Sequence, residues 1–74
     1  MHKLPSITSQ KVIKILEKKG FAFDRAKGSH HIYYHYKSRR RVVIPCHRKD
    51  LPKGTLMEIL KQAGINKEEL EKLL

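Results

Sequence analysis

The chain has 74 residues and a formal net charge of +10, with 17 lysines and arginines against 7 aspartates and glutamates. This length predicts one domain over residues 1–74 with a thin core, and a composition of 39% hydrophobic and 32% charged residues is typical of globular rather than disordered proteins. No apolar run approaches the roughly 18 residues of a membrane span, no apolar N-terminal segment indicates secretion, and the single cysteine excludes an internal disulfide, so we expect a cytoplasmic protein.

The first predicted element is an amphipathic helix over residues 9–19, whose apolar residues recur with helical spacing. Thr8 or Ser9 can cap its start, and Gly20 suits the position just after its end. The helix therefore has signals at both ends.

Three strands are predicted next, over residues 21–25, 29–36 and 41–44. The first alternates Phe21 and Phe23 with small or polar residues, as in a strand with one buried face. The second is rich in aromatic and β-favouring residues, and the third is stopped by Pro45. A turn at Lys27-Gly28 and a hairpin loop over 37–39 connect them.

Two helices complete the chain. Thr55 is predicted to cap the first and Gly64 to end it, while Asn66 opens a short last helix in which Glu69 completes a capping box. The element order α-β-β-β-α, followed by a short helix, predicts an α+β fold. One three-stranded antiparallel sheet would carry helices on one face and leave the other face free for a ligand.

The positive charge is concentrated in the middle of the chain. Residues 25–49 contain no acid, but they carry eight basic residues: Arg25, Lys27, Lys37, Arg39, Arg40, Arg41, Arg48 and Lys49. A one-sided positive field on so small a protein is typical of a nucleic-acid interface, because the phosphate backbone is a polyanion. The alternative is a solvated surface that keeps the protein soluble.

Within this basic stretch, residues 27–36 read Lys-Gly-Ser-His-His-Ile-Tyr-Tyr-His-Tyr. A glycine turn thus delivers a histidine to the start of a strand. Histidine, with an ordinary pKa of about 6.5, exchanges protons near neutral pH. His30 and His31 must point to opposite faces of the strand, and the pattern leaves open which face is buried. These features suggest a protein that holds RNA and can cut it.

Two further hypotheses concern the tyrosines, which could stack on bases, and the histidines, which could bind a metal. Of Tyr33, Tyr34 and Tyr36, which are candidates for stacking on bases, we expect one or two to be structural. His31 and His35 would lie about 13 Å apart along a strand at 3.3 Å per residue, too far to share one zinc ion. We therefore expect neither a metal nor another cofactor.

Four segments, in this order and spacing, carry a family resemblance: Val12-Ile-Lys-Ile-Leu-Glu-Lys-Lys-Gly-Phe21, Lys27-Gly-Ser-His-His-Ile-Tyr33, Val43-Ile-Pro45 and Gly54-Thr-Leu-Met-Glu-Ile-Leu-Lys-Gln-Ala-Gly64. Together they resemble the HicA family of messenger-RNA interferase toxins, from about residue 9 to residue 66. The resemblance implies a fold like a double-stranded-RNA-binding domain, ribosome-independent cleavage of messenger RNA, and a HicB antitoxin that covers the active site. It also implies that the functional histidine is the one directly after Gly-Ser, His30.

The chemistry expected of such a site is metal-independent. The 2′-hydroxyl of the RNA attacks the neighbouring phosphate while His30 acts as general acid or base. The residues expected to bind the RNA are Arg25, Lys27, Gly28 and Ser29 around the turn and Arg39, Arg40 and Arg41 in the hairpin. For the second proton transfer His47, Tyr34, Lys27 and water all stay open. The alternative function is a non-catalytic RNA-binding module with the same fold.

Overall fold

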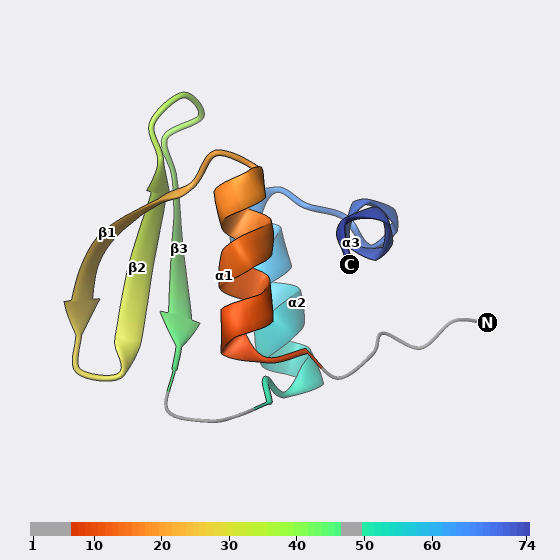
Figure 1. Ribbon diagram of the computed structural model, residues 1–74, viewed down its shortest axis with the longest axis horizontal. Coiled ribbons are helices and arrows are strands. Elements are labelled where there is room, and N and C mark those ends of the chain that lie inside the picture. Colours follow the sequence, from red (N-terminus) through yellow and green to blue (C-terminus); the bar gives the residue numbers. More distant parts are fainter. Residues whose placement is uncertain (1–6, 47–49) are drawn as a thin grey trace.

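The computed structural model describes residues 7–46 and 50–74. Its elements follow the predicted order: α1 (Ser9–Lys18), β1 (Ala22–Lys27), β2 (His30–His35), β3 (Arg40–Pro45), α2 (Lys53–Ala63) and α3 (Lys67–Leu73). The prediction of an α+β fold with the order α-β-β-β-α is therefore confirmed (Figure 1). None of the described helices is long and apolar enough to cross a membrane.

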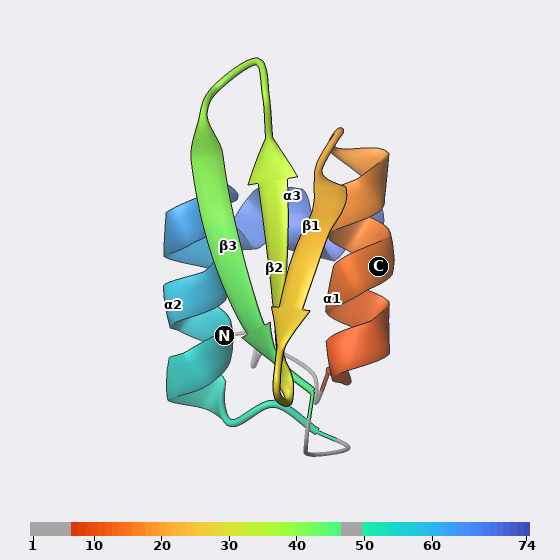
Figure 2. The ribbon, with the colours of Figure 1, turned by 90° about the vertical axis from the view of Figure 1, so that its left-hand side faces the viewer.

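The elements form three layers. The strands make one antiparallel sheet in the order β1-β2-β3, and α1 and α2 both pack on one face of it. The short helix α3 lies on the far side of these two helices from the sheet (Figure 1). No described element covers the opposite face of the sheet, which is turned toward the viewer in Figure 2. We call this uncovered surface the open face.

The core lies between the sheet and the helices. Its most deeply buried side chains come from all three layers: Val12, Leu16, Val42, Ile44, Leu56, Ile59 and Leu70. Tyr33 is the large β2 side chain in this cluster, and Phe21 enters it from the turn before β1. Because β2 and β3 contribute to the core through one face only, their other face remains available for function.

The predicted helix boundaries are partly confirmed. The Thr8 hydroxyl accepts a hydrogen bond from the Lys11 amide at 3.1 Å and caps α1, and the Asn66 side chain caps α3 through the Glu69 amide. Gly64 ends α2 with a left-handed φ of 75°. The prediction that Thr55 caps α2 is wrong, since α2 begins at Lys53 after Pro52 and has no side-chain cap. Pro52 occupies the cap position with φ of −58° and ψ of 150°, and its ring has no oxygen that could accept a hydrogen bond from a helix amide.

The prediction for the first strand is also wrong in one respect. Phe21 is buried but precedes the strand, and every residue of β1 is exposed, including Phe23 at 54%. The pairing with β2 shifts between Phe23 and Arg25, which leaves Asp24 as an extra residue and interrupts the expected alternation. The edge position of β1 leaves it without a second sheet neighbour. Pro45, expected to stop the third strand, is its last residue, which the edge position of β3 tolerates.

Candidate nucleic-acid interface

The two faces of β2 are distinguished by burial. Tyr33 pairs with the fully buried Val42, and both belong to the core, so the side chains in register with them face the helices. Since neighbouring residues alternate, His30, Ile32 and Tyr34 lie on the open face, while His31 lies on the core side. The pattern of the sequence left this choice open because Ile32 and Tyr33 are both apolar enough to be buried, and in the structure both are.

His30 is the first residue of β2 and is exposed. Its cross-strand partners are Lys27 on β1 and Pro45 on β3, so their side chains share its face. The structure thus places an ammonium group and an imidazole on directly opposed positions at one end of the sheet.

The turn before His30 is tight and anchored. Gly28 and Ser29 are its only two residues between β1 and β2, and Gly28 has φ of 60°. Such a glycine at the first position of a two-residue hairpin is typical of a type II′ turn, which a side chain at that position would strain. The Ser29 carbonyl accepts a hydrogen bond from the Cys46 amide at 2.7 Å, which ties the turn to the end of β3.

Two more cations lie on the open face. Arg25 is the cross-strand partner of Ile32, and Arg41 is the partner of Tyr34, so a basic side chain flanks β2 on either side. Both arginines are exposed, and Arg25 is 4.0 Å from the carboxylate of Asp24 in the bulge. Together with Lys27 they give the open face its positive charge.

The other two predicted RNA-binding arginines are placed differently. Arg40 is in register with His35 on the helix side of the sheet, and its Nη1 donates to the Gln62 carbonyl at 3.3 Å near the end of α2. Arg39 lies in the hairpin with φ of 61°, exposed to solvent. The structure therefore places Arg25, Lys27 and Arg41 on the same face as His30, with Lys27 directly opposite His30 and Arg41 toward the hairpin end, and it places Arg40 on the other face.

Sequence reasoning missed the roles of His35 and Ser38, which shape the hairpin between β2 and β3. Its loop lacks glycine, and His35 closes it: Nδ1 lies 2.7 Å from the Ser38 hydroxyl and accepts the Ser38 amide at 3.1 Å. The ring of His35 also packs on Phe21, with centroids 5.0 Å apart. A serine in a turn is the one available signal, since its hydroxyl commonly bonds nearby groups.

The shifted pKa values belong to groups away from the open face. Burial, then the charges of Glu17 and Cys46, raise the pKa of Tyr33 above its ordinary 10.0, and burial raises the pKa of the Cys46 thiol above 9.0. Cys46 is partly buried against the core. Neither group adds a charge to the interface near neutral pH.

The site is a surface rather than a cavity. A groove of about 480 Å³ lies along α2 and the start of α3, and none of its lining residues comes from the sheet. Across residues 7–46 and 50–74, no three metal-ligating side chains come close enough to hold an ion. His47, one candidate for the second proton transfer, and the basic residues Arg48 and Lys49 lie outside the described residues.

Comparison with protein-family models identifies a family for the chain. A family model described as the HicA toxin of bacterial toxin–antitoxin systems matches residues 9–65 of the 74. The match spans α1, the whole sheet and α2, and thus every open-face residue named above, but it ends before α3. No curated protein matches the chain.

Proposed function

The chain belongs to the HicA toxin family of bacterial toxin–antitoxin systems, and we propose that it acts as a metal-independent endoribonuclease that cleaves messenger RNA on the open face of its sheet. The observation that carries this proposal is the position of His30. It is exposed, directly opposite Lys27, on a face that also bears Arg25 and Arg41. A proton-transfer group and cations on one surface are what phosphodiester cleavage requires.

Cleavage would proceed by attack of the 2′-hydroxyl on its own phosphate, which needs one proton removed and one delivered to the leaving 5′-oxygen. His30 would perform one of these transfers as general base or general acid, worth typically 10²- to 10⁴-fold. Lys27 would stabilise the negative charge that develops on the phosphate. Gly28, which has no side chain, would let the phosphate approach the turn backbone.

The geometry narrows the choice of the second proton-transfer group. Tyr34 is four residues along β2 from His30, a separation of about 13 Å at 3.3 Å per residue. We therefore do not assign it to the same scissile phosphate. Among the candidates in the described residues Lys27 remains, together with water.

The remaining parts of the proposal follow from the family. A HicB-like antitoxin would be the protein partner and would cover the open face, and the toxin would act on messenger RNA in the cytoplasm. An antitoxin segment that meets Arg25, Lys27 and Arg41 should be acidic, since burying cations without enough neighbouring carboxylates is costly.

The test is incubation of purified messenger RNA with the wild type, with His30→Ala and with His31→Ala, all in EDTA. His31 is the matched control because it is the adjacent histidine on the opposite side of the strand. We expect fragments with the wild type and with His31→Ala, and intact RNA with His30→Ala. Cleavage by His30→Ala would overturn the role of His30. Intact, gel-shifted RNA in every lane would instead indicate a non-catalytic RNA-binding module.

A further inference from the structure

The hairpin end of the open face presents an aromatic ring beside a cation. Tyr34 is partly exposed and in register with Arg41 on β3. On its other side it faces Ala22, whose methyl group is too small to cover a phenol ring. The Tyr36 ring packs against Tyr34 in a T-shaped arrangement, with centroids 4.8 Å apart and planes at 77°.

An apolar strip joins this ring to His30. Ile32 lies between them on β2 and is only 8% exposed, although it points away from the core. Val43, its partner on β3, shares that face and is partly buried. The open face is therefore an apolar floor with a histidine at one end and a tyrosine about 13 Å away at the other, flanked by basic side chains.

We infer that Tyr34 and Arg41 form a stacking subsite for one unpaired base of an RNA strand that runs along β2, with its scissile phosphate at His30. This rests on the proposed function, because it places both sites on the same RNA. Base stacking on a protein ring needs a base whose own face is uncovered, whereas each base in a duplex is stacked on its neighbours. The substrate class is therefore single-stranded RNA, in spite of the fold's likeness to double-stranded-RNA-binding domains.

The test measures binding separately from cleavage. In a His30→Ala background, fluorescence anisotropy would give the Kd for a labelled single-stranded RNA and for the same strand annealed to its complement. Replacing Tyr34 with Leu should weaken single-strand binding by roughly 5- to 150-fold, the usual range for loss of one stacked base. Tyr34→Phe, which keeps the ring, should bind nearly as tightly as the parent.

Phe23→Leu is the matched control. Phe23 is an exposed ring on the same sheet, but it packs with His31 and Tyr33 on the core side. Its replacement should leave RNA affinity unchanged. If Tyr34→Leu fails to fold by circular dichroism, Arg41→Gln at an exposed position is the second variant and should also weaken single-strand binding.

Equal affinity of Tyr34→Leu and its parent, or tighter binding of the duplex than of the single strand, would overturn the subsite. The outcome for the nuclease is independent of this result. Should the wild type cleave RNA while Tyr34→Leu binds normally, the subsite fails and the nuclease stands. Should Tyr34→Leu lose affinity while the wild type never cleaves, the subsite stands as part of a binding module.

Discussion

Lys27 and His30 occupy directly opposed positions on β1 and β2, separated in sequence only by the two-residue turn that joins the strands. Opposed residues of an antiparallel pair have Cβ atoms about 4.5–5.5 Å apart and point to the same face. A phosphate bound at His30 is therefore within reach of the long Lys27 side chain, which makes this pair the centre of the proposed active site.

Replacing Lys27 with Gln removes the cation and keeps much of the side-chain length. We expect the single-turnover rate of RNA cleavage to fall by about 10²-fold, the scale seen when one group that stabilises developing charge is lost. Lys37→Gln is the matched control, because Lys37 is an exposed lysine in the hairpin at the other end of the sheet. Equal rates for the two variants would show that Lys27 contributes only general positive charge.

Arg40 and Arg41 are neighbours with separable roles. Arg41→Ala should weaken RNA binding and lower the slope of log K against log salt by about 1, because one phosphate contact is lost. Arg40→Ala should leave that slope unchanged. It should lower the free energy of unfolding by about 0.5–1.5 kcal/mol, since its guanidinium bonds the Gln62 carbonyl near the end of α2. Salt titrations of RNA binding and urea unfolding measure the two effects. A changed salt slope in Arg40→Ala together with an unchanged slope in Arg41→Ala would contradict the placement of Arg41 on the open face.

The parts of the fold that can be predicted from the sequence are those set by local signals. Gly64 and Asn66 mark helix ends because one adopts a left-handed φ and the other caps through its side chain, and both depend only on nearby residues. The exposure of Phe23 depends instead on a distant feature, the position of β1 at the sheet edge. The exclusion of Thr55 from the cap has a local cause, because the helix already begins directly after Pro52, three residues earlier.

The candidate site was predictable to a similar extent. The Gly28-Ser29 turn and His30 stand out in the sequence, but the face on which His30 lies does not, because Ile32 and Tyr33 are both buried. The separation of Arg40 from Arg41 depends on the register of β3 with β2 and on the contact of Arg40 with α2. Neither can be predicted from three consecutive arginines.

Stability should decline at alkaline pH, and Cys46 should contribute first. Burial raises the pKa of its thiol above the ordinary 9.0, so the unfolded chain loses this proton at lower pH than the folded one. The stabilisation is complete below pH 9 and is lost as the pH rises through the folded-state pKa. Tyr33, also raised, adds a second decline above pH 10. Urea unfolding from pH 7 to 11 should show that the free energy of unfolding declines less steeply above pH 9 in Cys46→Ala than in the wild type. The same pH profile for both proteins would contradict this.

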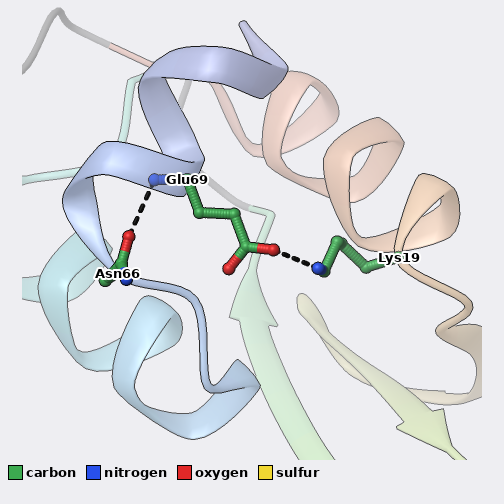
Figure 3. Close-up of polar contacts among 3 residues, drawn as sticks. All are labelled: Lys19, Asn66 and Glu69. Atoms are coloured by element: carbon green, nitrogen blue, oxygen red, sulfur yellow. Dashed lines mark hydrogen bonds and ion pairs between the residues drawn. The ribbon is translucent and has the colours of Figure 1, made fainter.

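The short helix α3 is held by the buried Leu70, by Leu73, which is partly buried against the core, and by an ion pair. Leu70 has no exposed surface, whereas the Glu69 carboxylate pairs with Lys19 at the end of α1 while the Glu69 amide bonds the Asn66 side chain (Figure 3). Leu70→Ala should lower the free energy of unfolding by about 2–5 kcal/mol, the range for a truncated core leucine. Glu69→Gln should cost less than about 1 kcal/mol, because both partners are partly solvated and the amide keeps its cap.

Urea unfolding of both variants decides whether α3, which lies beyond the family match, belongs to the same cooperative unit. A loss of the expected size for Leu70→Ala, with one transition by circular dichroism, would show that the core extends through α1 and α2 to α3. A loss below about 1 kcal/mol, or a separate low-denaturant transition, would show that α3 detaches while the sheet and its open face stay folded. RNA cleavage by Leu70→Ala should then be unaffected, because α1 and α2 lie between α3 and the sheet (Figure 1).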